Sequence, residues 1–305
     1  MFELVFLGTS ASAPSIQRGL PAQVVKHNQH RFLVDCGEGT QRQILESGLG
    51  FKKLNRILIT HGHLDHILGI GGLVSTYLRW EAIDKLEIFG GTSALKRIAD
   101  LLFKVVIRGI NPPFPIDLIP IKKGVFIEES DFSISAFPVS HRGPDCYGFT
   151  FKERGRHPFL AEKAEQLKIP SGPWRRDLVA GKKVKLPDGR MIKPDQVLGE
   201  FQPGIKLVIV GDSGKTDNLV KACKDADALV IEGTYLQGEI EMARKYAHLT
   251  ANDAAELAVQ SNVKKLFLTH ISRRYRAKDV QKEAREVFPN TNVVHDFDVF
   301  QIKKE

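Results

Sequence analysis

The sequence has little that would cross-link it or anchor it in a membrane. Its three cysteines, Cys36, Cys146 and Cys223, lie far apart and form no C-x-x-C pair. That spacing argues against a disulfide framework and against a thiolate zinc site. No apolar run approaches the ~20 residues that span a bilayer, and no basic segment precedes an apolar one near the N-terminus. We therefore expect a soluble, cytoplasmic protein with no membrane partner.

Repeats, low-complexity tracts and a nucleotide-binding loop are also missing from the chain. The segment 211–216 reads G-D-S-G-K-T and ends like a phosphate-binding loop. The first glycine of that pattern would fall at position 209, which is Ile209. We therefore predict no nucleotide cofactor.

What is present is an ordinary globular composition with a surplus of positive charge. Of the 305 residues, 42% are hydrophobic and 26% are charged, and the formal net charge is +8. The length is ample for a sizeable core. The charge favours a polyanionic partner without identifying it.

Short apolar segments bounded by Gly, Pro, Asp or Asn predict strands. They are residues 3–7, 31–34, 56–60, 85–89, 132–139, 147–151, 206–210, 228–231 and 265–269. Apolar residues at three- and four-residue spacings predict helices over 65–80, 93–107, 217–224, 250–261 and 278–288. Strands cluster early and alternate with helices late, which indicates an α/β fold with packed sheets and outer helices.

One stretch of the chain differs in composition. Residues 151–200 hold 12 Lys and Arg against 7 Asp and Glu, so they carry +5 of the net +8. We interpret about 152–195 as a basic arm inserted into a single domain spanning 1–305, without a core of its own. An exposed Trp174 beside Arg175 and Arg176 would suit contact with nucleic acid. A solvated loop region is the plainer alternative.

The strongest chemical signal is the motif T-H-G-H-L-D-H at residues 60–66, directly after a predicted strand. Its four candidate ligands are His61, His63, Asp65 and His66. Imidazole and carboxylate groups so close together indicate a metal site. Three more candidates, His141, Asp212 and His270, also follow strand-like segments. Strand ends of one sheet system can meet at one edge, and ligands placed there are held firmly.

The chain at this point resembles the metallo-β-lactamase superfamily and, within it, the RNase Z family of tRNA 3′-end endonucleases. The residues that narrow the resemblance are Leu7-Gly8-Thr9-Ser10 with Pro14 and Arg18, Val34-Asp35-Cys36-Gly37-Glu38-Gly39-Thr40, Gly211-Asp212-Ser213, Glu232-Gly233-Thr234, Ala247-His248-Leu249-Thr250, and Thr269-His270-Ile271-Ser272 with Arg274 and Tyr275. Three positions depart from the family pattern: Ser10, Gly19 and Arg273.

The resemblance implies a four-layer αββα sandwich with an inserted basic arm and a two-metal centre. One metal would take His61, His63 and His141 and the other Asp65, His66 and His270, with Asp212 bridging both. Histidine and carboxylate ligands suit two Zn²⁺ per subunit but also Mn²⁺ or Fe.

Catalytic roles also come from the resemblance. Asp65 would orient the attacking water or accept its proton. His248 would protonate the leaving ribose oxygen, and Glu232 would fix the tautomer of that histidine. Asp35 more plausibly supports a ligand than binds metal.

The implied function is hydrolysis of precursor tRNA after the discriminator nucleotide, which leaves a 3′-hydroxyl on the tRNA. The implied protein is a homodimer in which one arm grips tRNA bound at the other subunit. Candidate RNA contacts are Gly172, Pro173, Trp174, Arg175, Arg176, Lys182, Lys183, Arg273 and Arg274. Two alternatives stay open: a hydrolase of small esters or phosphodiesters on the same fold, and an RNA-binding module with a structural metal.

Overall fold

Strand β1 (Phe2–Gly8) shows why the fold is layered. The structure is a computed structural model and describes residues 1–80 and 82–304. Phe2, Leu4 and Phe6 alternate with Val5 and Leu7, and all five are buried. Because successive side chains of a strand point to opposite faces, both faces of β1 pack against another layer.

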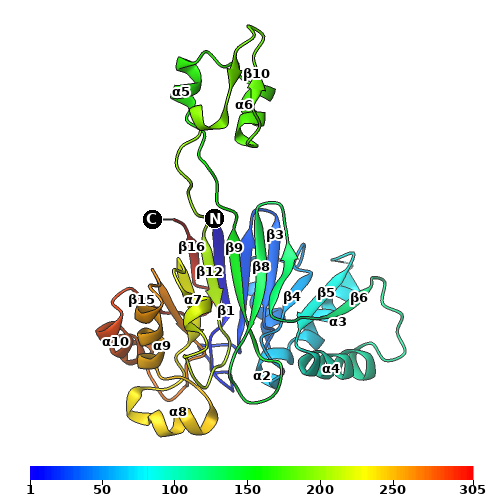
Figure 1. Cartoon of the computed structure of the whole chain (residues 1–305). Helices are drawn as coiled ribbons and strands as arrows, with labels where there is room; N and C mark the ends of the chain where they lie inside the picture. The colour runs from blue at the N-terminus through cyan, green and yellow to red at the C-terminus, as the bar shows by residue number, and fades with distance from the viewer. Residues whose placement is uncertain (81, 305) are drawn as a thin grey trace. The chain divides into compact units, whose positions relative to one another are not determined.

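The larger unit consists of Met1–Lys152 and Ile205–Glu305 and contains two seven-stranded sheets (Figure 1). The first sheet has the order β16-β1-β2-β3-β4-β5-β6. Its remaining strands are β2 (Ala22–His27), β3 (His30–Val34), β4 (Arg56–Leu58), β5 (Leu86–Gly90), β6 (Ile116–Pro120) and β16 (Val299–Ile302). Strands β3 to β6 run parallel, whereas β16, β1, β2 and β3 pair antiparallel.

The second sheet has the order β15-β14-β13-β12-β9-β8-β7. Its strands are β7 (Gly124–Glu128), β8 (Phe132–Pro138), β9 (Tyr147–Glu153), β12 (Lys206–Ile209), β13 (Ala228–Glu232), β14 (Leu266–Thr269) and β15 (Thr291–Val293). Strands β12 to β15 are parallel. In both sheets, therefore, a parallel set of strands directs its carboxyl ends to one edge.

Three apolar clusters define four layers in this unit. The central cluster lies between the sheets and is rich in phenylalanine, including Phe2, Phe132 and Phe267. The second cluster packs the first sheet against its helices, which are α1 (Thr40–Glu46), α2 (Leu64–Ile67), α3 (Ile70–Trp80), α4 (Thr92–Leu101) and η1 (Leu102–Val106). The third packs the second sheet against α7 (Val220–Cys223), α9 (Ala251–Gln260) and α10 (Ala277–Val287). The predicted four-layer α/β sandwich is thus confirmed (Figure 1).

Two predicted helices are interrupted. The helix expected over 65–80 is split into α2 and α3 around Gly69. A Cβ on Gly69 would lie 1.9 Å from the carbonyl oxygen of Gly37, so the chain bends where a glycine admits this close approach. The helix expected over 93–107 ends at Leu101 and continues as a π-helical turn, η1.

The second unit, Glu153–Gly204, contains α5 (Ala161–Gln166), α6 (Pro173–Val179), η2 (Pro194–Gln196) and a hairpin of β10 (Val184–Lys185) and β11 (Met191–Ile192). We call it the inserted unit. The prediction that it lacks a core is wrong, because seven buried apolar residues pack together in it: Ala164, Ile169, Leu178, Val184, Leu186, Ile192 and Val197.

The inserted unit also extends beyond the predicted end near residue 195. Phe159 pairs with Leu198, and Arg156 pairs with Gln202, so the returning chain is part of the same body. The last helix of the larger unit not yet mentioned, α8 (Ile240–Tyr246), follows a short 3₁₀ turn, η3 (Gln237–Glu239). No helix in the described part of the chain is both long and apolar enough for a bilayer crossing.

Candidate metal centre

The predicted metal ligands come together at one edge of the larger unit. His61 lies just beyond β4, His141 beyond β8, Asp212 beyond β12 and His270 beyond β14. The remaining three, His63, Asp65 and His66, lie on the turn that caps α2 and in its first turn. The four residues that follow strand ends have backbones fixed by the sheets, as a defined metal geometry requires.

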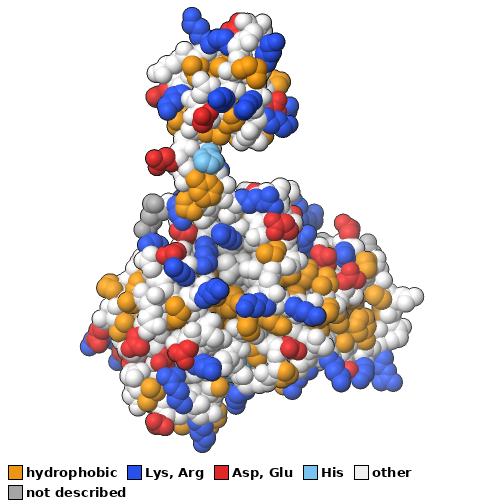
Figure 2. Space-filling model, viewed as in Figure 1, with side chains coloured by type: hydrophobic (Ala, Val, Ile, Leu, Met, Phe, Trp, Pro, Cys, Tyr) orange, Lys and Arg blue, Asp and Glu red, His pale blue; other side chains and the backbone are white. Residues whose placement is uncertain are grey.

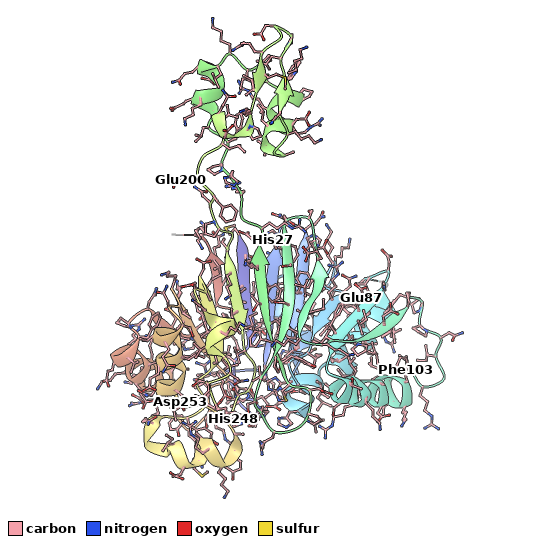
Figure 3. The ribbon with its side chains drawn as sticks, in the orientation of Figure 1. His27, Glu87, Phe103, Glu200, His248 and Asp253 are labelled. Atoms are coloured by element: carbon pink, nitrogen blue, oxygen red, sulfur yellow. The ribbon has the colours of Figure 1, made fainter. Side chains whose placement is uncertain are left out.

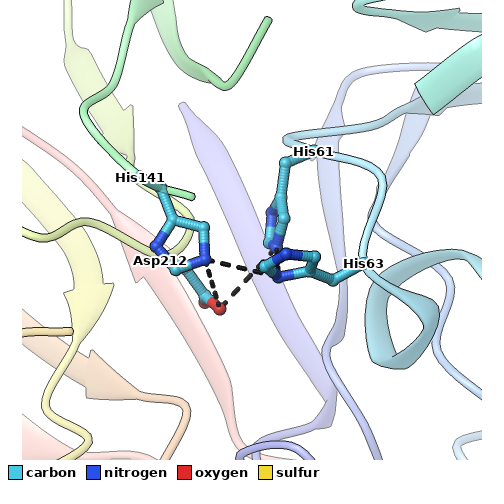
Figure 4. A group of neighbouring side chains, drawn as sticks. All are labelled: His61, His63, His141 and Asp212. Carbon is cyan, nitrogen blue, oxygen red and sulfur yellow. Dashed lines mark hydrogen bonds and ion pairs between the residues drawn. The ribbon is translucent and has the colours of Figure 1, made fainter. Parts of the chain in front are cut away.

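The first group of candidate ligands is His61, His63, His141 and Asp212. Nε2 of His61 and Nδ1 of His63 are 2.9 Å apart, and Nε2 of His141 lies 3.3 Å from the same His63 atom. Oδ2 of Asp212 lies 3.7 Å from His61 and 3.8 Å from His141 (Figure 4). Ligands bound tetrahedrally at about 2.0–2.1 Å are about 3.3 Å apart, so this spacing fits one ion.

The second group contains Asp65, His66 and His270. Nε2 of His66 and Nε2 of His270 lie 3.8 and 3.6 Å from Oδ2 of Asp65. The other carboxylate oxygen of Asp212, Oδ1, lies 3.5 Å from His66 and 3.4 Å from His270. Asp212 therefore faces one group with each oxygen, which is the arrangement of a bridging carboxylate.

Unpartnered buried atoms mark the place of a cation. Among the described residues, Nε2 of His66, Oδ1 of Asp212 and Nε2 of His270 are buried without a hydrogen-bond partner. Buried polar atoms are rarely left so in native proteins, and an ion is one explanation when they converge. The donor set thus fits a metal at this edge of the sheets.

Without a metal, the candidate ligands differ in protonation. Burial opposes protonation of His66, but the charges of Asp212 and Asp35 outweigh it and raise the pKa of His66 well above its ordinary value. Burial lowers the pKa of His61 well below its ordinary value, and burial with the neighbouring His141 lowers the pKa of His63 to about 4. Both rings are therefore neutral near pH 7, which is the form that binds metals. Burial raises the pKa of a carboxyl group, but in Asp212 the positive charges of His270 and His66 outweigh it, and its pKa lies well below the usual range.

Each ligand histidine except His63 is oriented by a second residue. Nδ1 of His66 bonds Oδ2 of Asp35 at 2.8 Å, and Nδ1 of His61 contacts the hydroxyl of Thr60 at 3.1 Å. Asp35 also accepts bonds from the amide and hydroxyl of Thr60, each at 2.8 Å. Such contacts fix the ring so that the other nitrogen faces the metal, and they raise the basicity of that nitrogen.

The remaining two histidines are held in the same way. Nδ1 of His141 donates to the carbonyl oxygen of Ala247 at 2.8 Å. Nδ1 of His270 lies 2.9 Å from the hydroxyl of Thr234, which itself donates to Glu232. Thr234 was not identified from the sequence as a functional residue, although it belongs to the Glu232-Gly233-Thr234 segment that carried the resemblance.

His248 and Glu232 form a buried pair beside the ligands. Nδ1 of His248 lies 3.1 and 3.0 Å from the two oxygens of Glu232, and 3.9 Å from Oδ2 of Asp212. Burial opposes protonation of His248, but the charge and hydrogen bond of Glu232 outweigh it and raise the pKa of His248 to about 9. The ring thus directs Nδ1 to Glu232 and can carry a proton. Figure 3 shows His248 at the same edge of the sheets as α8.

A cavity of about 350 Å³ opens over this site. Its lining includes His63, Asp65, Asp212 and His248, together with Ser12, Leu64, Arg97 and Arg142. The amide of Ser12 donates to Oδ2 of Asp65 at 3.1 Å. Neither arginine was identified from the sequence as a functional residue. The one sequence signal was that Arg142 directly follows the candidate ligand His141.

Of the residues predicted to contact RNA, the structure exposes some and partly buries others. Trp174 is half-buried and packs on the core of the inserted unit, contrary to the expectation that it is exposed. Arg175 bonds the carbonyl oxygen of Ile169 and is half-buried too. The exposed members are Gly172, Pro173, Arg176, Lys182, Lys183, Arg273 and Arg274. Arg274 pairs with Glu239 at 2.9 Å.

Comparison with known proteins shows near full-length similarity to ribonuclease Z proteins. The ribonuclease Z of Bradyrhizobium diazoefficiens (strain USDA 110) is 45% identical over 298 residues, covering 98% of this chain and 99% of the relative. That of Pediococcus pentosaceus is 37% identical over 310 residues, with 98% and 99% coverage.

Solved structures share the fold. The short form of human tRNase Z has a TM-score of 0.70 at 24% identity, covering 99% of this chain and all of that one. YhfI of Bacillus subtilis, a metallo-β-lactamase fold protein, has a TM-score of 0.69 at 17% identity, with 98% coverage of both chains. A family model described as Anti-Pycsar protein Apyc1 matches residues 2–160. That match includes His61 and His141 but ends before Asp212, His248 and His270. The alignments with the ribonuclease Z relatives cover nearly the whole chain.

The contacts of Asp35 generate a prediction about metal affinity. Asp35→Asn should weaken metal binding about 10–100-fold, the usual effect of removing a partner that orients a ligand, because His66 would lose its charged acceptor. Competition with a chromophoric chelator measures this. Glu38→Gln, an exposed carboxyl in the same loop, is the matched control. Equal affinity in the two variants would contradict the supporting role of Asp35.

Proposed function

Because the chain belongs to the ribonuclease Z family, we propose that it removes the 3′ trailer from precursor tRNA. It hydrolyses the phosphodiester bond after the discriminator nucleotide and leaves a 3′-hydroxyl on the tRNA. The single observation that carries this is the convergence of seven His and Asp side chains on one edge of the sheets, next to the His248–Glu232 pair. An acid placed beside a metal site is suited to phosphodiester cleavage.

The cofactor that we propose is two Zn²⁺ per subunit, with Mn²⁺ or Fe as alternatives. His61, His63 and His141 would hold one ion, Asp65, His66 and His270 the other, and Asp212 would bridge them. When bound, the two ions supply Lewis-acid stabilisation of the charge that develops on the phosphate. Three histidines with one carboxylate oxygen in the first group are a donor set that zinc accepts readily.

The residues of the chain provide positioning and proton transfer. Asp65 has an ionised carboxylate. Burial opposes its ionisation, but the nearby imidazoles of His270 and His66 outweigh burial and hold the pKa of Asp65 below its ordinary value. We assign it the orientation of the attacking water and acceptance of its proton. His248 donates a proton to the departing 3′-oxygen, and Glu232 keeps Nδ1 of His248 occupied so that Nε2 faces the cavity.

The inserted unit is the proposed tRNA-binding arm of the enzyme. Figure 2 shows Lys and Arg side chains over much of its visible surface, and residues 151–200 carry a net +5. Arg176, Lys182 and Lys183 are exposed there. Basic side chains that contact phosphates hold RNA helices by shape rather than by sequence. No member of the metal centre lies in this unit.

We assign the remaining partners as follows. The enzyme acts in the cytoplasm, on precursor tRNA, without a nucleotide cofactor, and as a homodimer. Exposed large apolar side chains on η1 and on the loop that follows it suit the dimer interface: Phe103, Val105 and Ile110. Apolar side chains exposed on neighbouring elements are typical of interaction sites.

The reaction is tested with purified protein and a precursor tRNA that carries a 3′ trailer. His248→Ala should slow cleavage about 10²–10⁴-fold, the usual loss when an acid catalyst is removed, while the metal content stays unchanged. Single-turnover rates and the mapped product ends give the result. His295→Ala removes an exposed histidine that pairs with Asp298 and is the matched control.

Three outcomes would overturn parts of this assignment. Loss of metal in His248→Ala would make His248 a ligand instead of an acid. A product with a 3′-phosphate on the tRNA would contradict the proposed direction of bond breakage. Cleavage of a small chromogenic phosphodiester but of no precursor tRNA would favour the small-substrate hydrolase.

The role of the arm is tested by replacing residues 154–203 with a short Gly-Ser linker. The junction is favourable because a Cβ on Gly204 would lie 2.2 Å from the carbonyl oxygen of Glu153, so the two ends are adjacent. The variant should keep its metals and its melting temperature but bind precursor tRNA more weakly. Each lost phosphate contact should flatten the log–log salt dependence of binding by about 0.7–0.9.

A second variant separates the charge of the arm from its fold. Arg176→Ala with Lys183→Ala leaves the buried cluster around Leu178 intact and should reproduce part of the loss. If the linker variant bound precursor tRNA with unchanged affinity and an unchanged salt slope, the basic stretch would be a solvated loop with no part in binding.

A further inference from the structure

A tyrosine and an arginine lie against each other beside the cavity, and neither belongs to the candidate metal ligands. The guanidinium carbon of Arg142 lies 5.8 Å from the ring centroid of Tyr246, and Nζ of Lys245 lies 5.6 Å from the same centroid. Arg142 is exposed and lines the cavity together with His248 and Asp65. Tyr246 is half-buried. Arg142 thus places a cation on the cavity wall with the ring of Tyr246 next to it.

The backbone that carries Tyr246 is fixed by the metal centre itself. Helix α8 ends at Tyr246, and Ala247 adopts the left-handed conformation with φ of 55°. The amide of His248 donates to the carbonyl oxygen of Ala243 at 2.8 Å and that of Ala247 to Arg244 at 3.2 Å, the two bonds of a Schellman motif. The carbonyl oxygen of Ala247 accepts from His141. These hydrogen bonds fix the backbone of Tyr246 relative to His141 and His248.

The chemistry of this surface selects a nucleotide. Unpaired bases stack on aromatic rings and on guanidinium planes, and a neighbouring phosphate is attracted by the positive charge of Arg142 and Lys245. No carboxylate is paired with Arg142 or Lys245 among the described residues, so neither cation is neutralised. A small ester would use neither the ring nor two cations.

The place of His248 decides which nucleotide is bound. In the proposed function, His248 protonates the 3′-oxygen that leaves the phosphorus, and that oxygen belongs to the nucleotide on the 5′ side of the cleaved bond. Tyr246 precedes His248 by two residues, and Arg142 follows His141 directly. Tyr246 and Arg142 therefore lie near His248. The other arginine of the cavity, Arg97, comes from α4 and donates to the carbonyl oxygen of Gly62, beside His61.

We propose that Tyr246 and Arg142 bind the unpaired discriminator nucleotide, with its base stacked on the Tyr246–Arg142 surface, and so position the scissile phosphate at the metal centre. This inference rests on the proposed function and adds a substrate-binding role for two residues that are not ligands. It gives the enzyme a way to select the junction between the paired acceptor stem and the unpaired 3′ end without reading sequence, since every base has a face that can stack.

Photocrosslinking tests the contact directly. The probe is the product of the proposed cleavage, a tRNA whose last nucleotide is 5-iodouridine at the discriminator position, bound to the metal-loaded, full-length protein. An iodinated base crosslinks to an aromatic side chain on which it stacks, and peptide mass spectrometry identifies that side chain. We expect the crosslink at Tyr246. It should be lost in Tyr246→Leu and kept in Tyr246→Phe, and it should not form when iodouridine occupies the last paired position of the acceptor stem.

Equilibrium binding gives an independent readout. Tyr246→Leu should raise the Kd for mature tRNA about 5- to 140-fold, the range that corresponds to the stacking of one base, with unchanged metal content. Tyr246→Trp should restore the affinity. Arg142→Ala should weaken binding and flatten its salt dependence by about 0.7, the value for one single-strand phosphate contact. Arg79→Ala removes an exposed arginine of α3 and should change neither quantity.

The outcomes are distinct. A crosslink to another residue, or tRNA binding with no crosslink at all, would overturn the proposed contact even if precursor tRNA is cleaved normally. Equal affinities of Tyr246→Leu and the wild-type protein would do the same. If the wild-type protein failed to cleave precursor tRNA, the proposed function would be wrong and this inference with it.

Discussion

A single buried carboxylate, that of Asp212, is the constraint on which the site depends. Its oxygens lie 3.4–3.8 Å from four imidazole nitrogens that come from both sheets. Burying a charge is costly unless opposite charge compensates it. The ionised form of Asp212 therefore requires positive charge at this point, which a protonated His66 provides in the protein alone and a metal provides more strongly. At this edge of the two sheets, the buried negative charge of Asp212 has to be balanced by positive charge.

The strands place the imidazoles around Asp212, and hydrogen bonds from neighbouring residues orient them. Parallel strands in each sheet bring His61, Asp212 and His270 to one edge, and the central phenylalanine-rich core holds the sheets face to face. Two of these supporting residues, Thr234 and Ala247, also connect a candidate ligand to a residue outside the metal centre. Thr234 joins His270 to the Glu232 of the acid pair. Ala247 joins His141 to the turn that carries Tyr246 and His248. The residues proposed to act in catalysis and substrate binding are thus linked by hydrogen bonds to the candidate metal ligands.

The sequence indicated much of this arrangement because metal chemistry leaves a local trace. Histidines and aspartates directly after apolar strands can be identified without a structure, and they included all seven residues that the structure brings together. Among the supporting groups only Asp35, which follows a predicted strand and contacts His66, was expected from the sequence. Thr60 and Thr234 are ordinary threonines, and Ala247 acts through a carbonyl oxygen that any residue has. The break at Gly69 depends on Gly37, which is distant in sequence. The core of the inserted unit was missed because its apolar residues are scattered between charges and turns.

The most direct test of the account is the number of metal ions bound per chain, with and without Asp212. Native mass spectrometry of the metal-loaded protein, combined with elemental analysis, gives this number. The account predicts two ions per chain in the wild-type protein and the loss of both affinities in Asp212→Ala, because each group loses the oxygen that faces it. One ion in the wild-type protein, or two ions retained with unchanged affinity in Asp212→Ala, would contradict the claim that Asp212 joins two metal sites into one centre.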